Sequence, residues 1–167
     1  PQVLSSAASD VYKRQENSIG TIIKHIPGHG LAKVDSHFST PYINKSLQYL
    51  LKNDFKAFKN KNSFFAMTGH LIFNQIDKDN TVTHSRKMIN IIRKKVGFKN
   101  LLISDDLSMK SLKKSLKINT IDTFKAGCNL ALHCNGKLKE MEIVGKNSPL
   151  VSKFIIKKTS QFYNILR

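Results

Sequence analysis

The stretch Leu101-Leu102-Ile103-Ser104-Asp105-Asp106 is a short apolar run that ends in two adjacent carboxylates. A run of this length is typical of a strand that is buried on both faces, as in a parallel sheet. Because neighbouring residues of a strand point in opposite directions, the two carboxylates are not expected to share a proton. We expect one of them to face the end of the sheet and the other to cap Met109 and a helix that follows it.

Similar apolar runs occur elsewhere in the chain, separated by longer segments of helical period. The predicted strands are residues 21–24, 64–67, 101–104 and 129–133, and the predicted helices are residues 42–55, 85–95, 118–126 and 149–166. We expect Thr83 or Ser85 to cap the second helix. Thr120 with Asp122 is expected to begin the third helix, and Gly127 to end it. This α/β alternation predicts four βα units around a parallel sheet; in a (β/α)8 barrel, reactive groups gather at the carboxyl ends of the strands.

The net charge of +17 results from 28 Lys and Arg against 11 Asp and Glu. A basic nucleic-acid-binding module is one explanation of this charge, and it requires the lysines to cluster on one face. The lysines are instead scattered beside Asn and Ile, three residues with A/T-rich codons, and the chain has no recognised nucleic-acid-binding motif. We therefore favour solvated lysine faces and expect no nucleic-acid partner.

The two cysteines, Cys128 and Cys134, are too few for a disulfide framework, and reduced thiols are the simpler interpretation. No apolar stretch approaches the roughly 20 residues that a membrane span needs. The first residues lack the apolar centre of a signal peptide. These features predict a cytoplasmic protein without a membrane span.

The first fifteen residues differ in composition from the rest of the chain. Residues 5–15 can be back-translated into a DNA sequence that resembles a transposase adaptor used to prepare sequencing libraries. We therefore treat residues 1–15 as an adaptor-like, non-native segment and exclude them from fold reasoning.

The densest group of polar residues is Lys24-His25-Ile26-Pro27-Gly28-His29-Gly30, followed by Asp35-Ser36-His37. Three imidazoles and a carboxylate from this loop could form a metal site, which would make the protein a metal-dependent hydrolase. Lys24 beside them would oppose a cation. The alternative is structural: Pro27-Gly28 makes a turn and the histidines cap it.

Together with Ser104-Asp105-Asp106-Leu107, this loop resembles the signature set of the β-N-acetylglucosaminidases of glycoside hydrolase family three. The resemblance extends from about Ile19 to Asn135 and includes Met67-Thr68-Gly69-His70. It implies a (β/α)8 barrel. Two spaced motifs in the right order are more specific than either motif alone.

The resemblance also implies a role for each matching residue. Asp105 is then the nucleophile, which attacks the anomeric carbon of a terminal GlcNAc. His37 takes the place of the second carboxyl group that retaining glycosidases normally use as acid/base, and Asp35 orients its imidazole. Lys24 and His25 bind sugar hydroxyls.

The complete barrel of that family has about four more βα units before Thr21. The resemblance therefore implies that residues 16–167 are the C-terminal half of the barrel and that this chain alone does not catalyse. It implies a retaining exo-β-N-acetylglucosaminidase that acts on peptidoglycan-derived muropeptides in cell-wall recycling, with no metal or other cofactor. Transfer of the glycosyl group to phosphate is a second reaction that such a site allows.

Overall fold

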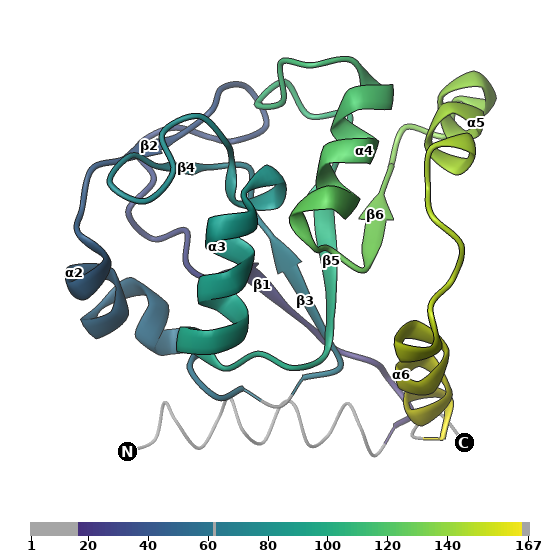
Figure 1. Ribbon diagram of the computed structural model, residues 1–167, viewed down its shortest axis with the longest axis horizontal. Helices are drawn as coiled ribbons and strands as arrows, with labels where there is room; N and C mark the ends of the chain where they lie inside the picture. The colour runs from purple at the N-terminus through teal and green to yellow at the C-terminus, as the bar shows by residue number, and fades with distance from the viewer. Residues whose placement is uncertain (1–16, 62, 165–167) are drawn as a thin grey trace.

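The computed structural model describes residues 17–61 and 63–164, and its centre is a four-stranded parallel sheet (Figure 1). The strands follow the order β1-β3-β5-β6. Their bounds are β1 (Ile22–Ile26), β3 (Phe65–Thr68), β5 (Leu101–Asp106) and β6 (Leu130–Leu132). Two short strands, β2 (Tyr42–Ile43) and β4 (Ile72–Phe73), pair in parallel as a separate sheet. Consecutive strands joined by helical crossovers confirm the predicted series of βα units.

Helices occupy each connection between the main strands. After β1 come α2 (Leu47–Lys52) and the 3₁₀ helix η1 (Asp54–Phe58), and after β3 come the 3₁₀ helix η2 (Val82–His84), α3 (Arg86–Ile91) and its π-helical continuation η3 (Ile92–Val96). Helix α4 (Leu116–Ala126) joins β5 to β6, and α5 (Leu138–Lys146) and α6 (Lys153–Tyr163) follow β6. Helices α3 and α4 lie on the same side of the sheet in Figure 1.

Strand register divides the side chains into two faces. Ile22 pairs with Phe65, and Phe65 with Leu101, so these three residues form one layer across the sheet. On the opposite face, Ala66 and Leu102 are buried in the core against the helices. Because side chains alternate along a strand, Ile103 and Asp105 lie on the same face as Leu101. In a closed barrel this face is the interior, and Asp105 lies at its carboxyl end.

The four strand predictions are confirmed with small changes at their ends, but three of the four predicted helix starts were wrong. Tyr42 and Ile43 form a strand because they pair with β4, and α2 begins only after its cap, Ser46. Helix α4 is capped by Ser115, whose hydroxyl accepts from the Ile118 amide, rather than by Thr120. The caps expected at Ser85 and Gly127 are confirmed: Ser85 accepts from Met88, and Gly127 adopts a left-handed φ of 115°.

Helix α5 was not predicted, and α6 begins at Lys153 instead of at the predicted residue 149, while residues 165 and 166 of that predicted helix lie outside the described residues. Phe162 of α6 packs on the amino-terminal end of the sheet, with its ring 4.9 Å from that of Phe65 and nearly perpendicular to it. The ring of Phe64 lies 5.6 Å away. A Cβ at Gly20 would collide with the Phe162 ring, so glycine permits this close approach.

Within the described residues, no helix is long and apolar enough to span a membrane. Cys128 is buried and Cys134 exposed, and both are free thiols. Burial raises the pKa of Cys128 to about 12, so this thiol stays protonated. The adaptor-like segment, residues 1–15, lies outside the described residues, and its assignment stays a prediction.

Two serine caps allow a stability test of the fold. Ser85 is fully buried, and its hydroxyl accepts from the Met88 amide at 3.1 Å while it donates to Asp77 at 2.6 Å. Ser115 makes only the exposed cap bond, at 3.4 Å. We expect Ser115→Ala to lower the free energy of unfolding by about 1 kcal/mol, as for an ordinary cap. We expect Ser85→Ala to lower it by about 2–3 kcal/mol, because the Asp77 carboxylate also loses a donor. Urea denaturation of both variants checks this, and equal losses would contradict it.

Candidate active site

Asp105 lies at the carboxyl end of β5, where its two carboxylate oxygens have different partners. Oδ1 accepts from the backbone amide of Asp106 at 2.9 Å. Oδ2 lies 3.3 Å from Nε2 of His25, which comes from β1 on the far side of β3. The Asp105 side chain is 14% exposed and that of His25 is 26% exposed. The carboxylate is thus fixed in place and still partly accessible.

The pKa of Asp105 is lowered from its ordinary value. Burial is the largest single influence and acts to raise the pKa, but hydrogen bonds from His25 and from the Asp106 amide, together with the nearby His70, outweigh it. These donors favour the ionised form. The group is therefore a carboxylate at neutral pH.

Asp106 points to other partners, as expected for a neighbour on the same strand. Its carboxylate accepts from the amide and the hydroxyl of Ser108, at 3.1 Å and 2.5 Å, and from the amide of Cys134 at 3.2 Å. The expected cap of a helix at Met109 is wrong, because a turn follows β5 and α4 begins only at Leu116. Asp106 therefore holds the turn after β5 and the end of β6 together.

The loop after β1 is anchored by Asp54, a residue that no sequence pattern singled out. Its carboxylate accepts from the Gly30 amide at 3.3 Å. A Cβ at Gly28 would collide with the same carboxylate, so the glycines of this loop allow its close approach to η1. Burial raises the pKa of Asp54. The ring of His29 packs on that of His25, with centroids 5.3 Å apart.

His37 and Asp35 form a pair further along the loop. The imidazole Nδ1 lies 2.7 Å from Oδ1 of Asp35, which also accepts from the His37 amide at 2.8 Å. These two hydrogen bonds, the backbone bond first, lower the pKa of Asp35. The His37 side chain is 70% exposed, and within the described residues it makes no hydrogen bond or ion pair with Asp105. The structure therefore joins Asp35 to His37 and His25 to Asp105, as two separate pairs.

Lys24 is exposed, and its ammonium has no hydrogen-bond or ion-pair partner among residues 17–61 and 63–164. It pairs in register with Met67, which pairs with Ile103, so it lies two residues below the level of Asp105 on the sheet. As far as the described residues go, this ammonium near the carboxyl end of the sheet is available to bind a ligand.

The predicted metal alternative is not supported by the positions of its residues. In the part of the chain that the structure describes, no group of three or more His, Cys, Asp or Glu side chains is arranged to hold a metal ion. The four candidate ligands lie in two separate places. His25 and His29 lie near Asp105, and His37 lies with Asp35.

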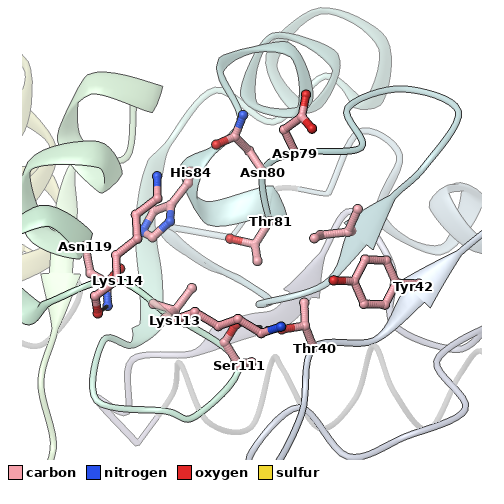
Figure 2. Close-up of a pocket in the computed structure, with 12 residues that line it drawn as sticks. Thr40, Tyr42, Asp79, Asn80, Thr81, His84, Ser111, Lys113, Lys114 and Asn119 are labelled. Atoms are coloured by element: carbon pink, nitrogen blue, oxygen red, sulfur yellow. Dashed lines mark hydrogen bonds between the residues drawn. The ribbon is translucent and has the colours of Figure 1, made fainter.

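A pocket of about 140 Å³ lies elsewhere, between the segments 79–84 and 111–114 (Figure 2). Four lining side chains have a buried polar atom without a partner among the described residues: Thr81 Oγ1, His84 Nε2, Ser111 Oγ and Asn119 Oδ1. Burial lowers the pKa of His84 to about 4, so its imidazole is neutral at pH 7. Polar atoms in such pockets usually bind ordered water. Neither Asp105 nor His25 lines this pocket, so it is separate from the group of side chains at the carboxyl end of β5.

Other polar residues that follow the strands also meet near Asp105. The imidazole of His70, after β3, donates to the backbone carbonyl of Asp106 at 3.0 Å. Nε2 of His133, after β6, lies 3.2 Å from Glu140, and its Nδ1 lies 3.8 Å from Asp106. The sequence signals for these contacts were the place of His70 in the stretch Met67-Thr68-Gly69-His70, which the family resemblance includes, and the place of His133 at the end of the predicted strand of residues 129–133. Asp54 had none, because it lies in a lysine-rich and asparagine-rich helical segment.

Comparison with known proteins relates this chain to a known protein family. A family model described as the glycosyl hydrolase family 3 N terminal domain matches residues 2–159. The β-hexosaminidase of Histophilus somni (strain 2336) is 30% identical over 144 residues, which are 81% of this chain and 41% of that protein. The β-hexosaminidase of Haemophilus influenzae (strain ATCC 51907 / DSM 11121 / KW20 / Rd) is 34% identical over 120 residues, 67% of this chain and 34% of that protein. The chain thus spans less than half the length of these relatives.

Solved structures share the same arrangement of strands and helices. Native NagZ from Neisseria gonorrhoeae matches with a TM-score of 0.72 and 27% identity, over 86% of this chain and 42% of that one. The complex of that protein with N-trifluoroacetyl-D-glucosamine matches with a TM-score of 0.73 and 26% identity, over 86% and 43%. Because the family model matches nearly the whole chain and these relatives share its fold, the chain belongs to the N-terminal domain family of glycosyl hydrolase family 3.

Proposed function

We propose that this chain supplies the nucleophile and the acid/base of a retaining exo-β-N-acetylglucosaminidase, as the C-terminal half of its catalytic barrel. The observation that carries the proposal is the ionised, partly accessible carboxylate of Asp105 at the carboxyl end of β5. It lies on the barrel-interior face of the sheet, with His25 beside it. The β-hexosaminidases among the relatives, and the NagZ complex with a GlcNAc derivative, support the substrate class.

In the first proposed step, a free oxygen lone pair of Asp105 attacks the anomeric carbon of a terminal GlcNAc. The bond from that carbon to the leaving oxygen breaks, and the leaving oxygen takes a proton from His37. In the second step, His37 accepts a proton from water while the water oxygen attacks the same carbon. The Asp105 carboxylate is then released, and the configuration of the sugar is retained.

The Asp35–His37 pair suits this acid/base role. The ionised Asp35 accepts from Nδ1–H of the imidazole, which leaves Nε2 to exchange the proton with the reacting oxygen. The same carboxylate stabilises the imidazolium, as in the catalytic triads of other hydrolases. Because His37 is exposed and makes no contact with Asp105, we propose that movement of its loop brings the imidazole to the sugar.

Lys24 and His25 are proposed to bind the sugar. The Lys24 ammonium is free to donate to hydroxyls, and His25 already holds the nucleophile at 3.3 Å. Fixed donors of this kind align the ring for attack. We further propose muropeptides derived from peptidoglycan as substrates and the cytoplasm as the site of action, both on the family resemblance.

The nucleic-acid alternative requires the basic residues to gather on one face. Lysines occur on α2, which carries Lys52, and on α6, which carries Lys153 and Lys157. Figure 1 shows these two helices at opposite sides of the described part of the chain. This distribution favours solvated faces over a single electrostatic footprint.

Substitution of the nucleophile and of the acid/base tests the proposed mechanism. With the protein expressed from its complete gene, we expect Asp105→Ala to lower kcat on a 4-nitrophenyl β-N-acetylglucosaminide by on the order of 10⁴-fold, because no covalent intermediate can form. His37→Ala should lose about 10²–10⁴-fold with a poor leaving group and much less with 4-nitrophenolate, which leaves without protonation.

Glu142→Ala is the matched control, since it removes an exposed carboxylate of α5 that pairs only with Lys146. Its turnover should equal that of the unaltered protein. Unchanged turnover in Asp105→Ala would contradict the mechanism. A glycosyl phosphate formed when phosphate is present would assign transfer to phosphate in place of hydrolysis.

The pH dependence of kcat/KM tests the state of Asp105. Activity requires the ionised carboxylate, so activity is present above the pKa of Asp105 and is lost as the pH falls through that pKa. Because the pKa of Asp105 is lowered, this loss should occur below pH 3.8, the ordinary pKa of an aspartate. His25→Ala removes a bond to the ionised form, and the acid limb should therefore move to higher pH. His29→Ala, which removes the neighbouring ring, should move it less. An acid limb that His25→Ala leaves in place would contradict the proposed pairing.

A further inference from the structure

A chain of buried hydrogen bonds ends beside the proposed nucleophile. His70, Thr83 and Thr68 are each fully buried. The Thr68 hydroxyl oxygen lies 2.9 Å from that of Thr83, which lies 2.8 Å from Nδ1 of His70. Nε2 of His70 lies 3.0 Å from the carbonyl oxygen of Asp106. The chain therefore connects β3 and η2 to the end of β5.

The direction of each hydrogen bond in this chain is determined by chemistry. The Asp106 carbonyl can only accept, so Nε2 of His70 carries the proton. Burial lowers the pKa of His70, which makes the imidazole neutral and leaves a lone pair on Nδ1. The Thr83 hydroxyl must therefore donate to Nδ1 in preference to the Gly69 carbonyl, which is more distant at 3.4 Å. The Thr83 oxygen then accepts from the Thr68 hydroxyl.

The contacts of Asp106, at one end of this chain of hydrogen bonds, show which group the hydrogen bonds hold in place. The backbone of Asp106 accepts from His70 through its carbonyl and donates through its amide to Oδ1 of Asp105. That amide is one of the two donors that fix the carboxylate, the other being His25. A rotation of the backbone at residue 106 would turn the amide away from Asp105. With its proton on Nε2, His70 donates to the Asp106 carbonyl and so opposes this rotation. The other neutral tautomer would place a lone pair on Nε2, and that lone pair would repel the carbonyl.

We propose that His70 and Thr83 are positioning residues that hold the backbone of Asp106, and through its amide the carboxylate of Asp105, in the orientation needed for attack. This inference rests on the proposed function and deepens it. Neither residue is a catalytic residue, since both are buried and act through Asp106. Networks whose members are all satisfied in this way make a site rigid.

Thr83→Val tests the inference, because valine has the shape of threonine without the hydroxyl. Nδ1 of His70 then loses its donor, and the tautomer with the proton on Nδ1 becomes available. In the protein from the complete gene we expect kcat to fall by on the order of 10-fold, with KM changed by less than about 2-fold, because orientation of the nucleophile changes and sugar binding does not. Thr83→Ser keeps the hydroxyl and should restore kcat.

Thr123→Val is the matched control. Thr123 is equally buried, but its hydroxyl donates at 2.8 Å only to the Asn119 carbonyl within α4. Thr123→Val removes a buried hydroxyl of the same kind as that of Thr83, and it should leave kcat unchanged. Thr68→Val, at the distal end of the chain, should lower kcat in the same direction by a smaller factor, and it provides a second test where Thr83→Val fails to fold.

A readout that does not depend on turnover separates this inference from the proposed function. Carbon-13 NMR titration of the Asp105 carboxyl should show a higher pKa in Thr83→Val than in the unaltered protein, and no change in Thr123→Val. A protein that fails to hydrolyse any N-acetylglucosaminide but shows this pattern would reject the proposed function and keep the positioning role. The inference would be overturned if Thr83→Val changed neither the pKa of Asp105 nor kcat. It would also be overturned if Thr123→Val changed both quantities as much as Thr83→Val does.

Discussion

The parallel register of β1, β3 and β5 is the constraint on which the rest of the site depends. It places Lys24, Met67 and Ile103 in one layer, so that His25 and Asp105 meet above β3 although they are 80 residues apart in the chain. Parallel strands need helical crossovers, and these crossovers also bring every strand's carboxyl end to the same edge. The polar residues after β3 and β6 therefore meet Asp106 at that edge, and the site is assembled by the sheet itself.

Much of this arrangement could be predicted because it is local or periodic. The apolar runs of the four strands, the cap at Ser85 and the glycine that ends α4 each have a signal within a few residues. The pairing of Asp35 with His37 is also local, since the two residues lie two positions apart in one loop. The start of α2 was missed because pairing with β4 overrides the helical pattern at Tyr42 and Ile43.

The contacts that could not be predicted join residues far apart in the chain. Asp54 anchors the loop at Gly30 from 24 residues away, and its own surroundings in the sequence resemble a solvated helix face. His70 belongs to a stretch included in the family resemblance, and Thr83 was a candidate helix cap, but only the structure shows that His70 contacts Asp106 and that Thr83 contacts His70. Their roles depend on tertiary distances of about 3 Å, which no pattern along the chain encodes.

The central claim is that Asp105 becomes covalently bonded to the sugar. A 5-fluoro-N-acetylglucosaminyl fluoride, whose fluorine substituent slows hydrolysis of the glycosyl-enzyme, should trap this intermediate in the protein from the complete gene. Peptide mass spectrometry should then find the added sugar on the peptide that contains Asp105, at that residue, and none after Asp105→Ala. A sugar attached to Asp106 or to any other residue, or inactivation without a covalent adduct, would contradict the account.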